Sequence, residues 1–201
     1  MLPNNVSGIV FDLDNTLVSS SLDFSQIRQA IGCPSDQDIL GFVDNLPNPR
    51  QMDAREKILH FEMLDARDAT ILPGTESLLK LLDNRQIPYA IVTRNCKKAA
   101  LLKIQNNNIN IPLLLTRENS KAKPAPDSVY FIADYWQQAP ENILFVGDHL
   151  YDIQTAKNAQ AMSCLINYGH SLPYEHLAHL VVQNLSELTS TLINSVGLAD
   201  I

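Results

Sequence analysis

Residues 8–16, with the sequence GIVFDLDNT, decide the fold of this 201-residue chain. Four apolar positions run without interruption from Gly8 to Phe11 and lead directly into Asp12 and Asp14. Continuous apolar runs of this length are typical of strands that are buried on both faces of a parallel sheet. The stretch therefore predicts a central strand that carries two carboxylates at its C-terminal end.

Further apolar runs follow, and helical patterns separate most of them. The runs are 89–92 (YAIV), the weaker 113–115 (LLL), 143–146 (ILFV), 164–166 (CLI) and a late candidate at 180–182 (LVV). Helical spacing of apolar residues occurs at about 75–82, 97–107, 127–136, 153–161 and 186–195. Such alternation predicts an α/β fold, a doubly wound parallel sheet of Rossmann-like type with right-handed crossovers.

One long stretch breaks this alternation. From about Leu22 to Ala69 the chain has no convincing strand and at least three helical patterns, around 24–31, 38–43 and 52–63. We therefore expect a helical insert of about fifty residues between the first two strands. The predicted division is a core domain of residues 1–18 and 70–201 and a small α-helical domain of residues 19–69.

Composition limits the classes of partner. The chain has 15 Lys and Arg against 22 Asp and Glu, and the resulting net charge of −7 disfavours nucleic-acid binding through a general electrostatic field. No apolar run approaches the roughly 18 residues of a membrane helix, so no membrane partner is expected. The three cysteines are widely spaced and the N-terminal segment lacks a signal-peptide pattern, which predicts a soluble cytoplasmic protein.

Polar residues gather at the ends of the predicted strands, where ligands bind in open α/β sheets. These residues are Asp12, Asp14, Thr16, Thr93, Arg94, Asn95, Asp148 and Asp152, with Lys121 and Lys123 before a predicted helix. Taken singly, each could be a helix cap, a turn residue or a solvated side chain, and Asp148 and Asp152 could simply complement a helix dipole. Together they follow the right strands in the right order to meet at one edge of the sheet.

The combined pattern resembles a known family. Asp12-x-Asp14-x-Thr16, Thr93, Lys123-Pro124 and Gly147-Asp148-x-x-x-Asp152 are similar to the four motifs of the haloacid dehalogenase superfamily, in its phosphoglycolate phosphatase-like branch. The likeness extends over nearly the whole chain and includes 72–74, where the core resumes. The helical insert looks like that family's cap. The resemblance implies a Mg²⁺-dependent hydrolase of phosphate esters on a Rossmann-like core.

The resemblance also implies individual roles. Asp12 would be the nucleophile that forms an aspartyl phosphate, and Asp14 the acid and later the base. Lys123, in preference to Lys121, would offset charge on the nucleophile and the phosphate. Thr93 and the backbone N–H of Arg94 would hold phosphoryl oxygens. Thr16 is placed with them among the substrate-binding residues and would orient the loop that carries Asp12 and Asp14. The implied Mg²⁺ ligands are the Asp12 and Asp148 carboxylates and the Asp14 backbone carbonyl. Asp152 would lie just outside this set of direct ligands.

Charge supports the need for a cation in this arrangement. Four carboxylates and one lysine would leave a strongly negative site that repels a phosphate dianion. Oxygen ligands without a Cys/His cluster favour Mg²⁺ over zinc. Cys96 and His149 are interpreted as neighbours of the site. On the insert, Arg28, Arg50, Arg55 and Lys57 are candidates to meet a second anionic group, although we expect most of them to be only solvated helix faces.

Other functions stay open at this point. A phosphatase acting on a small phosphorylated metabolite is favoured. A phosphomutase of the same superfamily and a non-catalytic phosphate-binding protein on the same fold are the alternatives. Receiver domains also carry aspartates, a Thr and a Lys, but there Thr and Lys come last and an insert of this length has no place. The identity of the substrate and the oligomeric state do not follow from the sequence.

Overall fold

The computed structural model describes residues 6–195, so the ends of the predicted core domain, 1–5 and 196–201, lie outside the described residues. Within this range the strands form one six-stranded parallel sheet in the order β3-β2-β1-β4-β5-β6. The strands are β1 (Gly8–Phe11), β2 (Tyr89–Val92), β3 (Leu114–Leu115), β4 (Ile143–Gly147), β5 (Met162–Ile166) and β6 (Leu180–Val182). The predicted α/β fold is confirmed.

The apolar runs are continuous because both faces of the sheet are covered. In β1, Ile9 and Phe11 enter one core cluster and Val10 enters the other. The same alternation places Leu144 and Phe145 of β4 on opposite faces. A strand with a helix layer on each side buries every side chain, and all residues of β1, β2, β4 and β5 are buried.

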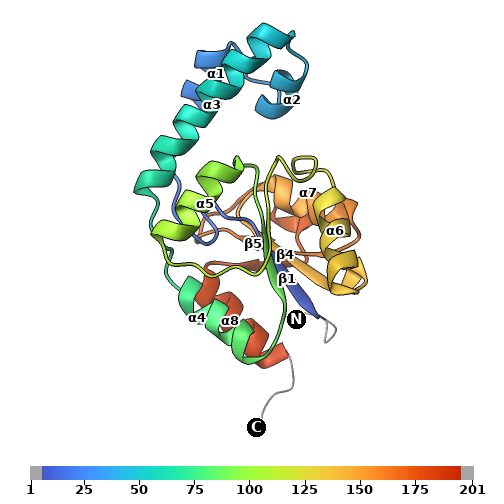
Figure 1. Cartoon of the computed structure of the whole chain (residues 1–201). Helices are drawn as coiled ribbons and strands as arrows, with labels where there is room; N and C mark the ends of the chain where they lie inside the picture. Colours follow the sequence, from blue (N-terminus) through green and yellow to red (C-terminus); the bar gives the residue numbers. More distant parts are fainter. Residues whose placement is uncertain (1–5, 196–201) are drawn as a thin grey trace.

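Helices form the two outer layers (Figure 1). The first core cluster includes residues from α4 (Thr75–Asn84), α5 (Lys97–Asn106) and α8 (Leu185–Ser195). The second includes residues from α6 (Asp127–Trp136) and α7 (Leu150–Asn158). Two short 3₁₀ helices, Pro140–Asn142 and Glu175–Leu177, precede β4 and β6. The chain therefore builds a three-layer core with the strand ends directed toward one edge.

The insert folds as three helices above that edge (Figure 1). They are α1 (Phe24–Ile31), α2 (Ile39–Asp44) and α3 (Asn48–Asp68), and the three predicted helical patterns are confirmed. Ile27, Val43 and Ile58 belong to a separate apolar cluster that joins the three helices. Asp23 and Asp38 cap α1 and α2 through side-chain bonds to backbone N–H groups. We call residues 19–69 the cap, and this boundary remains a prediction.

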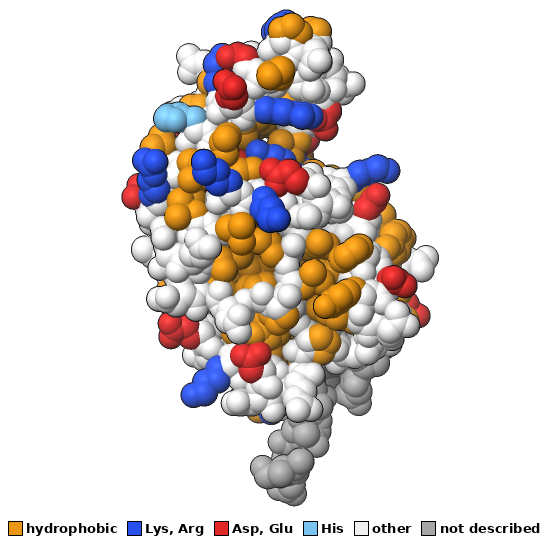
Figure 2. All heavy atoms as spheres, in the orientation of Figure 1, with side chains coloured by type: hydrophobic (Ala, Val, Ile, Leu, Met, Phe, Trp, Pro, Cys, Tyr) orange, Lys and Arg blue, Asp and Glu red, His pale blue; other side chains and the backbone are white. Residues whose placement is uncertain are grey.

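The cap also packs on the core. The lower half of α3 lies against α5, and Ala66 of α3 shares a buried cluster with Cys96 and Ala99 (Figure 1). In the space-filling view the cap forms a narrower lobe above the core (Figure 2). Among residues 6–195, no helix combines the length and the apolar character that crossing a membrane requires.

Candidate active site

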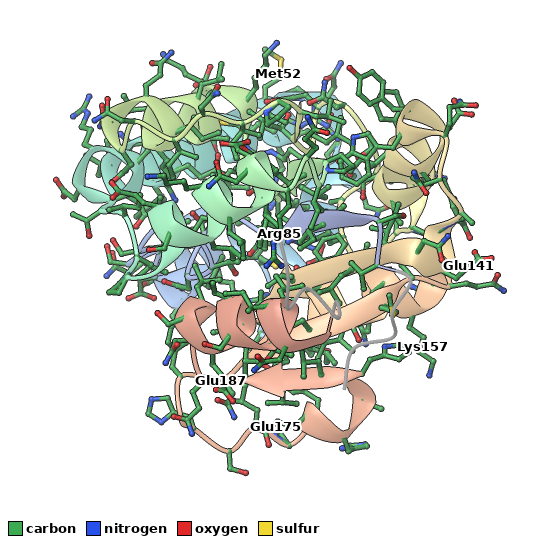
Figure 3. All side chains as sticks on the ribbon, turned by 90° about the horizontal axis from the view of Figure 1, so that it is seen from below. Met52, Arg85, Glu141, Lys157, Glu175 and Glu187 are labelled. Atoms are coloured by element: carbon green, nitrogen blue, oxygen red, sulfur yellow. The ribbon has the colours of Figure 1, made fainter. Side chains whose placement is uncertain are left out.

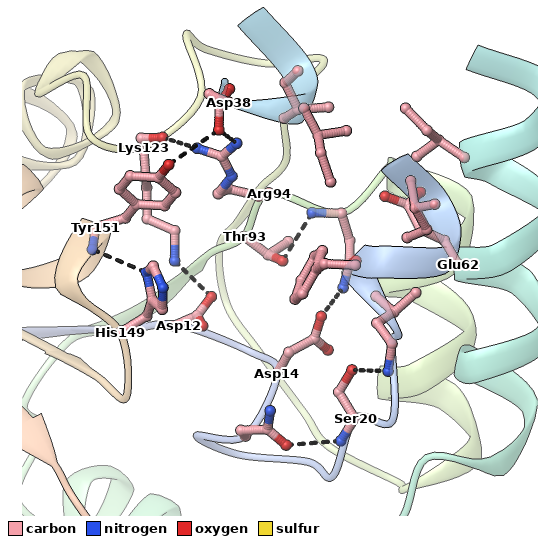
Figure 4. Close-up of a pocket in the computed structure, with 18 of the residues that line it drawn as sticks. Asp12, Asp14, Ser20, Asp38, Glu62, Thr93, Arg94, Lys123, His149 and Tyr151 are labelled. Atoms are coloured by element: carbon pink, nitrogen blue, oxygen red, sulfur yellow. Dashed lines mark hydrogen bonds and ion pairs between the residues drawn. The ribbon is translucent and has the colours of Figure 1, made fainter. Parts of the chain in front are cut away.

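A cavity of about 320 Å³ lies between the cap and the C-terminal edge of the sheet. Its lower wall includes Asp12 after β1, Thr93 after β2 and Asp148 after β4. Its upper wall comes from α1, α2 and α3 of the cap. Figure 4 shows Asp12, Asp14, Thr93 and Lys123 around one space. The parallel topology thus brings together residues that are more than one hundred positions apart in sequence.

Lys123 is the buried cation of this cavity. Its Nζ lies 2.6 Å from Asp12 Oδ1 and 2.6 Å from Asp152 Oδ1, and its side chain is 3% exposed. Although burial opposes ionisation, the charges of the two carboxylates raise the pKa of Lys123 above its ordinary value. Lys123 therefore stays charged. By contrast, Lys121 is largely exposed beside Asp127 and does not line the cavity.

Three carboxylates meet beside Lys123. Each of Asp12, Asp148 and Asp152 has one carboxylate oxygen that lies within 4.8 Å of those of the other two. Burial, with the charges of Asp12 and Asp152, raises the pKa of Asp148 to about 8. Burial also raises the pKa of Asp152 to about 6. An oxygen-only cluster whose members repel one another has the donor chemistry that suits a hard divalent cation such as Mg²⁺.

The turn after β4 fixes Asp152 in this cluster. Asp152 Oδ2 accepts a hydrogen bond from the backbone N–H of His149 at 3.0 Å, and His149 caps α7 in return. The N-terminus of α7 places Asp152 beside Lys123, while Asp148 stays directly at the end of the strand. Asp152 therefore caps its helix and pairs with Lys123 at the same time.

Asp14 is held by two side chains that the sequence analysis did not assign to it. Lys103 of α5 pairs with Asp14 Oδ1, and Asn95 Nδ2 donates to Asp14 Oδ2 at 2.8 Å. Burial, reinforced by the charge of Asp12, raises the pKa of Asp14 to about 6 despite the opposing charge of Lys103. The Asp14 carboxyl therefore keeps its proton to a higher pH than an ordinary aspartate does.

Lys103 also joins the core to the base of the cap. Its side chain is fully buried, and its Nζ lies 2.6 Å from Asp65 Oδ2 near the end of α3. Asp65 accepts further hydrogen bonds from Ser20 Oγ at 2.9 Å and from the backbone N–H of Ser21 at 2.6 Å. One lysine thus contacts Asp14, α3 and, through Asp65, the segment that leads into the cap.

Thr93 and Arg94 both line the cavity. Thr93 Oγ1 accepts a hydrogen bond from the backbone N–H of Asn95 at 3.1 Å, which orders the turn after β2 (Figure 4). The Arg94 guanidinium pairs with Asp38 of the cap, donates to the Lys123 carbonyl, and lies 4.5 Å from the ring centre of Tyr151. Arg94 therefore bridges cap and core.

Thr16 does not line the cavity, although it follows Asp14 so closely in sequence. Its side chain is fully buried, and its Oγ1 has no hydrogen-bond partner among the described residues. The structure therefore leaves it no contact with a ligand in the cavity. A role in shaping the loop that carries Asp12 and Asp14 remains a prediction.

The four basic cap residues named in the sequence analysis differ in whether they line the cavity. Among Arg28, Arg50, Arg55 and Lys57, the cavity lining includes only Arg28. Arg55 and Lys57 form exposed pairs with Asp44 and Asp53. The expectation that such residues are mostly solvated helix faces fits these two. His149, interpreted from sequence as a neighbour, does line the cavity while it caps α7.

Lys103 could have been noticed in the sequence. In the helical pattern of 97–106 it lies on the same face as the buried Ala99, Ala100 and Ile104. A lysine on an apolar face is rarely buried without a partner, so this spacing indicates a buried ion pair. Asp38 and Glu62, which pair with Arg94 and Arg117, carry no such local signal because their partners lie far away in sequence.

Comparisons with known proteins agree with this geometry. The family model described as haloacid dehalogenase-like hydrolase matches residues 20–166. A haloacid dehalogenase-like hydrolase domain-containing protein of Arabidopsis thaliana is 32% identical over 172 residues, which cover 80% of this chain and 70% of the relative. A phosphoglycolate phosphatase of Vibrio vulnificus is 26% identical over 200 residues, which cover 85% of this chain and 88% of the relative.

Solved structures show the same fold. A HAD family hydrolase from Deinococcus radiodurans, with bound phosphate and sodium, superimposes with a TM-score of 0.72 at 21% identity, covering 99% of this chain and 100% of that one. The family model spans most of the sequence and includes the motifs at Thr93, Lys123 and Asp148–Asp152, while Asp12, Asp14 and Thr16 precede the matched range. This chain belongs to the haloacid dehalogenase-like hydrolases.

Proposed function

We propose that this hydrolase is a Mg²⁺-dependent phosphatase that acts on a small phosphorylated metabolite through an aspartyl-phosphate intermediate. The observation that carries the proposal is the position of Asp12, whose carboxylate lies at the end of β1 between Lys123 and two further carboxylates. The phosphatase name of the Vibrio relative and the phosphate in the Deinococcus structure support the same chemistry.

In the first step, an Asp12 carboxylate oxygen attacks the phosphorus atom and the ester oxygen leaves. Asp14 gives its proton to that oxygen, and its pKa of about 6 makes a proton available near neutral pH. Lys103 and Asn95 hold the Asp14 carboxyl in place. The products are the free alcohol and an acyl phosphate on Asp12.

In the second step, Asp14 takes a proton from a water molecule, which attacks the phosphorus atom of the acyl phosphate. The Asp12 carboxylate leaves and inorganic phosphate is released, so the enzyme returns to its starting state. Thr93 and the backbone N–H of Arg94 hold phosphoryl oxygens during both steps, and Lys123 offsets their negative charge.

The residues that would hold the metal are Asp12, Asp148 and the backbone carbonyl of Asp14, with Asp152 orienting the group around them. When bound, Mg²⁺ supplies positive charge that allows a phosphate dianion to approach the carboxylates. The clustering of three carboxyl groups and the raised pKa of Asp148 support this assignment.

Hydrolysis of 4-nitrophenyl phosphate tests the proposal. We expect release of nitrophenol with Mg²⁺ and its loss in EDTA. Asp12→Asn should lower kcat by about 10³-fold or more, because an amide is a poor nucleophile. Asp53→Asn, which changes an exposed cap carboxylate paired with Lys57, is the matched control and should retain activity. Full activity of a correctly folded Asp12→Asn protein would refute the assigned nucleophile.

A further inference from the structure

One basic side chain of the cap, Arg28 of α1, lines the cavity without a carboxylate partner among the described residues. We infer that the substrate carries a carboxylate in addition to its phosphate and that Arg28 binds this carboxylate. The inference rests on the proposed phosphatase function and names the substrate class of the same cavity. Three observations carry it: the hydrogen bonds of Arg28, the charges around it and the apolar side chains beside it.

The hydrogen bonds of Arg28 use only one of its three nitrogens. Nη1 donates to the carbonyl oxygens of Pro34 at 2.7 Å and Gln37 at 2.5 Å, and it lies 3.3 Å from Cys33 Sγ. These neutral acceptors hold the guanidinium against the loop between α1 and α2 without cancelling its charge. Within the described residues, Nε and Nη2 have no hydrogen-bond partner. Their parallel N–H groups form the planar fork that matches a carboxylate.

The other charged side chains on the cap side of the cavity are already paired with one another. Asp38 pairs with Arg94, as Figure 4 shows, and Glu62 pairs with Arg117. Each of the two carboxylates that line this part of the cavity therefore has an arginine of its own, and Arg28 leaves one positive charge uncompensated. One carboxylate of the substrate balances this charge, whereas a second phosphate dianion would exceed it.

The charge of Arg28 acts inside the cavity. Burial and the charge of Asp38 raise the pKa of Tyr151, a cavity residue in the first turn of α7. The charges of Arg94 and Arg28 oppose this rise, so Arg28 influences a core side chain across the cavity. Asp36, in the loop that Arg28 holds, is exposed and lies outside the cavity lining. Arg28 is thus placed to bind a group that enters between cap and core.

Apolar side chains beside Arg28 suit the carbon body of such a substrate. Phe24 lies one turn before Arg28 on α1, and both residues line the cavity. Phe24 is 61% exposed although it is a large aromatic side chain, and Leu22, Ile39 and Leu40 extend the apolar wall. Contact with the substrate would remove this surface from water. The site therefore favours the phosphate ester of a hydroxy acid whose carbon body has an apolar face.

Two pairs of esters test the inference. The 3- and 4-carboxyphenyl phosphates carry the carboxylate, and the 3- and 4-carbamoylphenyl phosphates replace it with a neutral amide of nearly the same shape. The amide withdraws electrons more strongly than the carboxylate, so leaving-group chemistry alone favours the carbamoyl esters. We expect the opposite order in at least one pair, with kcat/KM at least about tenfold higher for the carboxylated member, because its charge pairs with Arg28.

A pair of arginine variants tests whether Arg28 is responsible. Arg28→Gln should lower the ratio of the two kcat/KM values by about tenfold, and a general loss of activity cancels in this ratio. Arg50→Gln is the matched control, since Arg50 is an exposed cap arginine outside the cavity lining. Figure 3 shows Met52, two positions further along α3, at the rim of the molecule with its side chain directed outward. Arg50→Gln should leave the ratio unchanged.

A second pair of variants leaves the bonds between Arg28 and its loop in place. Phe24→Glu puts a carboxylate one turn before Arg28, where the two charges can pair on the same helix face. The ratio should then fall as it does in Arg28→Gln. Phe24→Gln, which has the same length without the charge, should keep a higher ratio than Phe24→Glu. Equal ratios in these two variants would contradict the assigned role of Arg28.

The outcomes separate the two claims. Metal-dependent turnover of 4-nitrophenyl phosphate without a preference for the carboxylated ester in either pair would overturn the inference and leave the phosphatase proposal standing. A preference that survives Arg28→Gln would overturn it as well. An absence of metal-dependent turnover with every one of these esters would refute the phosphatase proposal, and the inference would fall with it.

Discussion

At the scale of residues, the two carboxylates that follow β1, Asp12 and Asp14, contact two different buried lysines. Lys123 contacts Asp12 and Asp152, whereas Lys103 contacts Asp14 and Asp65. Asp12 and Asp14 therefore each contact a separate cation, which each of them shares with another carboxylate. This division suits residues with different tasks, because the proposed nucleophile must stay ionised while the proposed acid must exchange a proton.

Replacing Lys103 should affect stability and catalysis together. Lys103→Met leaves Asp14 and the buried Asp65 without their cation, so we expect a loss of about 3–5 kcal/mol in the free energy of unfolding. Chemical denaturation measures this loss, with exposed Lys98→Met on the same helix as the control. Hydrolysis of an alkyl phosphate should fall more than that of 4-nitrophenyl phosphate, whose leaving group needs less protonation. An equal fall for both would contradict a positioning role for Lys103.

The carboxylate cluster predicts a pH dependence of stability in EDTA. A carboxyl whose pKa is higher in the folded state binds more protons there, so the free energy of unfolding falls as pH rises toward the folded pKa. Asp148 titrates near 8, while Asp14 and Asp152 titrate near 6 and His149 below its ordinary 6.5. Between pH 6.5 and 8 the decrease should therefore come mainly from Asp148.

Thermal or urea unfolding in EDTA measures this decrease. One proton limits it to about 1.4 kcal/mol per pH unit. Asp148→Asn should remove most of the slope, because the amide does not titrate. A wild-type stability that is constant or rises with pH over this interval would show that Asp148 is ionised already at pH 6.5 in the folded state.

At the scale of elements, the ends of strands and helices decide the site. In the turn between β4 and α7, the strand end and the first turn of the helix approach each other very closely. A Cβ atom built at Gly147 would lie 2.2 Å from Asp152 Oδ2 and 2.3 Å from Asp152 Cγ. The absence of a side chain at Gly147 therefore lets the first turn of α7 bring Asp152 against the strand end and onto Lys123.

Gly147→Ala should consequently displace Asp152. We expect a cost of about 1–3 kcal/mol in unfolding free energy and a clear fall in kcat, since Lys123 would lose one of its two partners. Gly41→Ala in α2 is the matched control: its Cβ would meet Asp38 Oδ2 at an ordinary 3.5 Å. That variant should be neutral or stabilising by about 0.5–1 kcal/mol. A Gly147→Ala protein with unchanged stability and kcat would rule out this steric account.

Most elements could be predicted from sequence because their patterns are local. The apolar runs at 8–11, 89–92 and 180–182 match β1, β2 and β6 exactly in their bounds. β5 begins at Met162, two residues before the predicted run, because Ser163 interrupts the apolar pattern while its hydroxyl contacts His179 Nδ1 at 3.0 Å. Helix α7 begins at Leu150, before its apolar pattern, because His149 and Asp152 cap it.

At the scale of the whole molecule, two of the ion pairs among the described residues connect the cap to the core above the site, in addition to Lys103–Asp65 at the base of the cap. Arg94 after β2 binds Asp38 of the cap, and Arg117 after β3 binds Glu62 of α3. The side chains of Glu62 and Arg117 are only 6% and 17% exposed. A pair that is this buried couples its two partners strongly, whereas an exposed pair contributes little.

A double-mutant cycle should reveal this coupling. Glu62→Leu and Arg117→Met should each destabilise the protein by about 3–5 kcal/mol, because each leaves a buried charge unpaired. The double variant should lose less than the sum, with a coupling of about 0.5–3 kcal/mol. The exposed Asp53–Lys57 pair of α3 serves for comparison and should couple by less than about 0.5 kcal/mol. Additive losses at Glu62 and Arg117 would show that the pair does not hold the cap.

The sequence by itself determined the parallel sheet, the helical insert and the residues at the strand ends, because apolar periodicity and strand-end chemistry are encoded within a few neighbouring positions. Only the tertiary structure decided which side chains meet across the cavity. Lys103 with Asp65, Arg94 with Asp38 and Glu62 with Arg117 join residues that are 38 to 56 positions apart in sequence. Buried charges select partners by proximity in space, and that proximity arises only when the cap packs on the core.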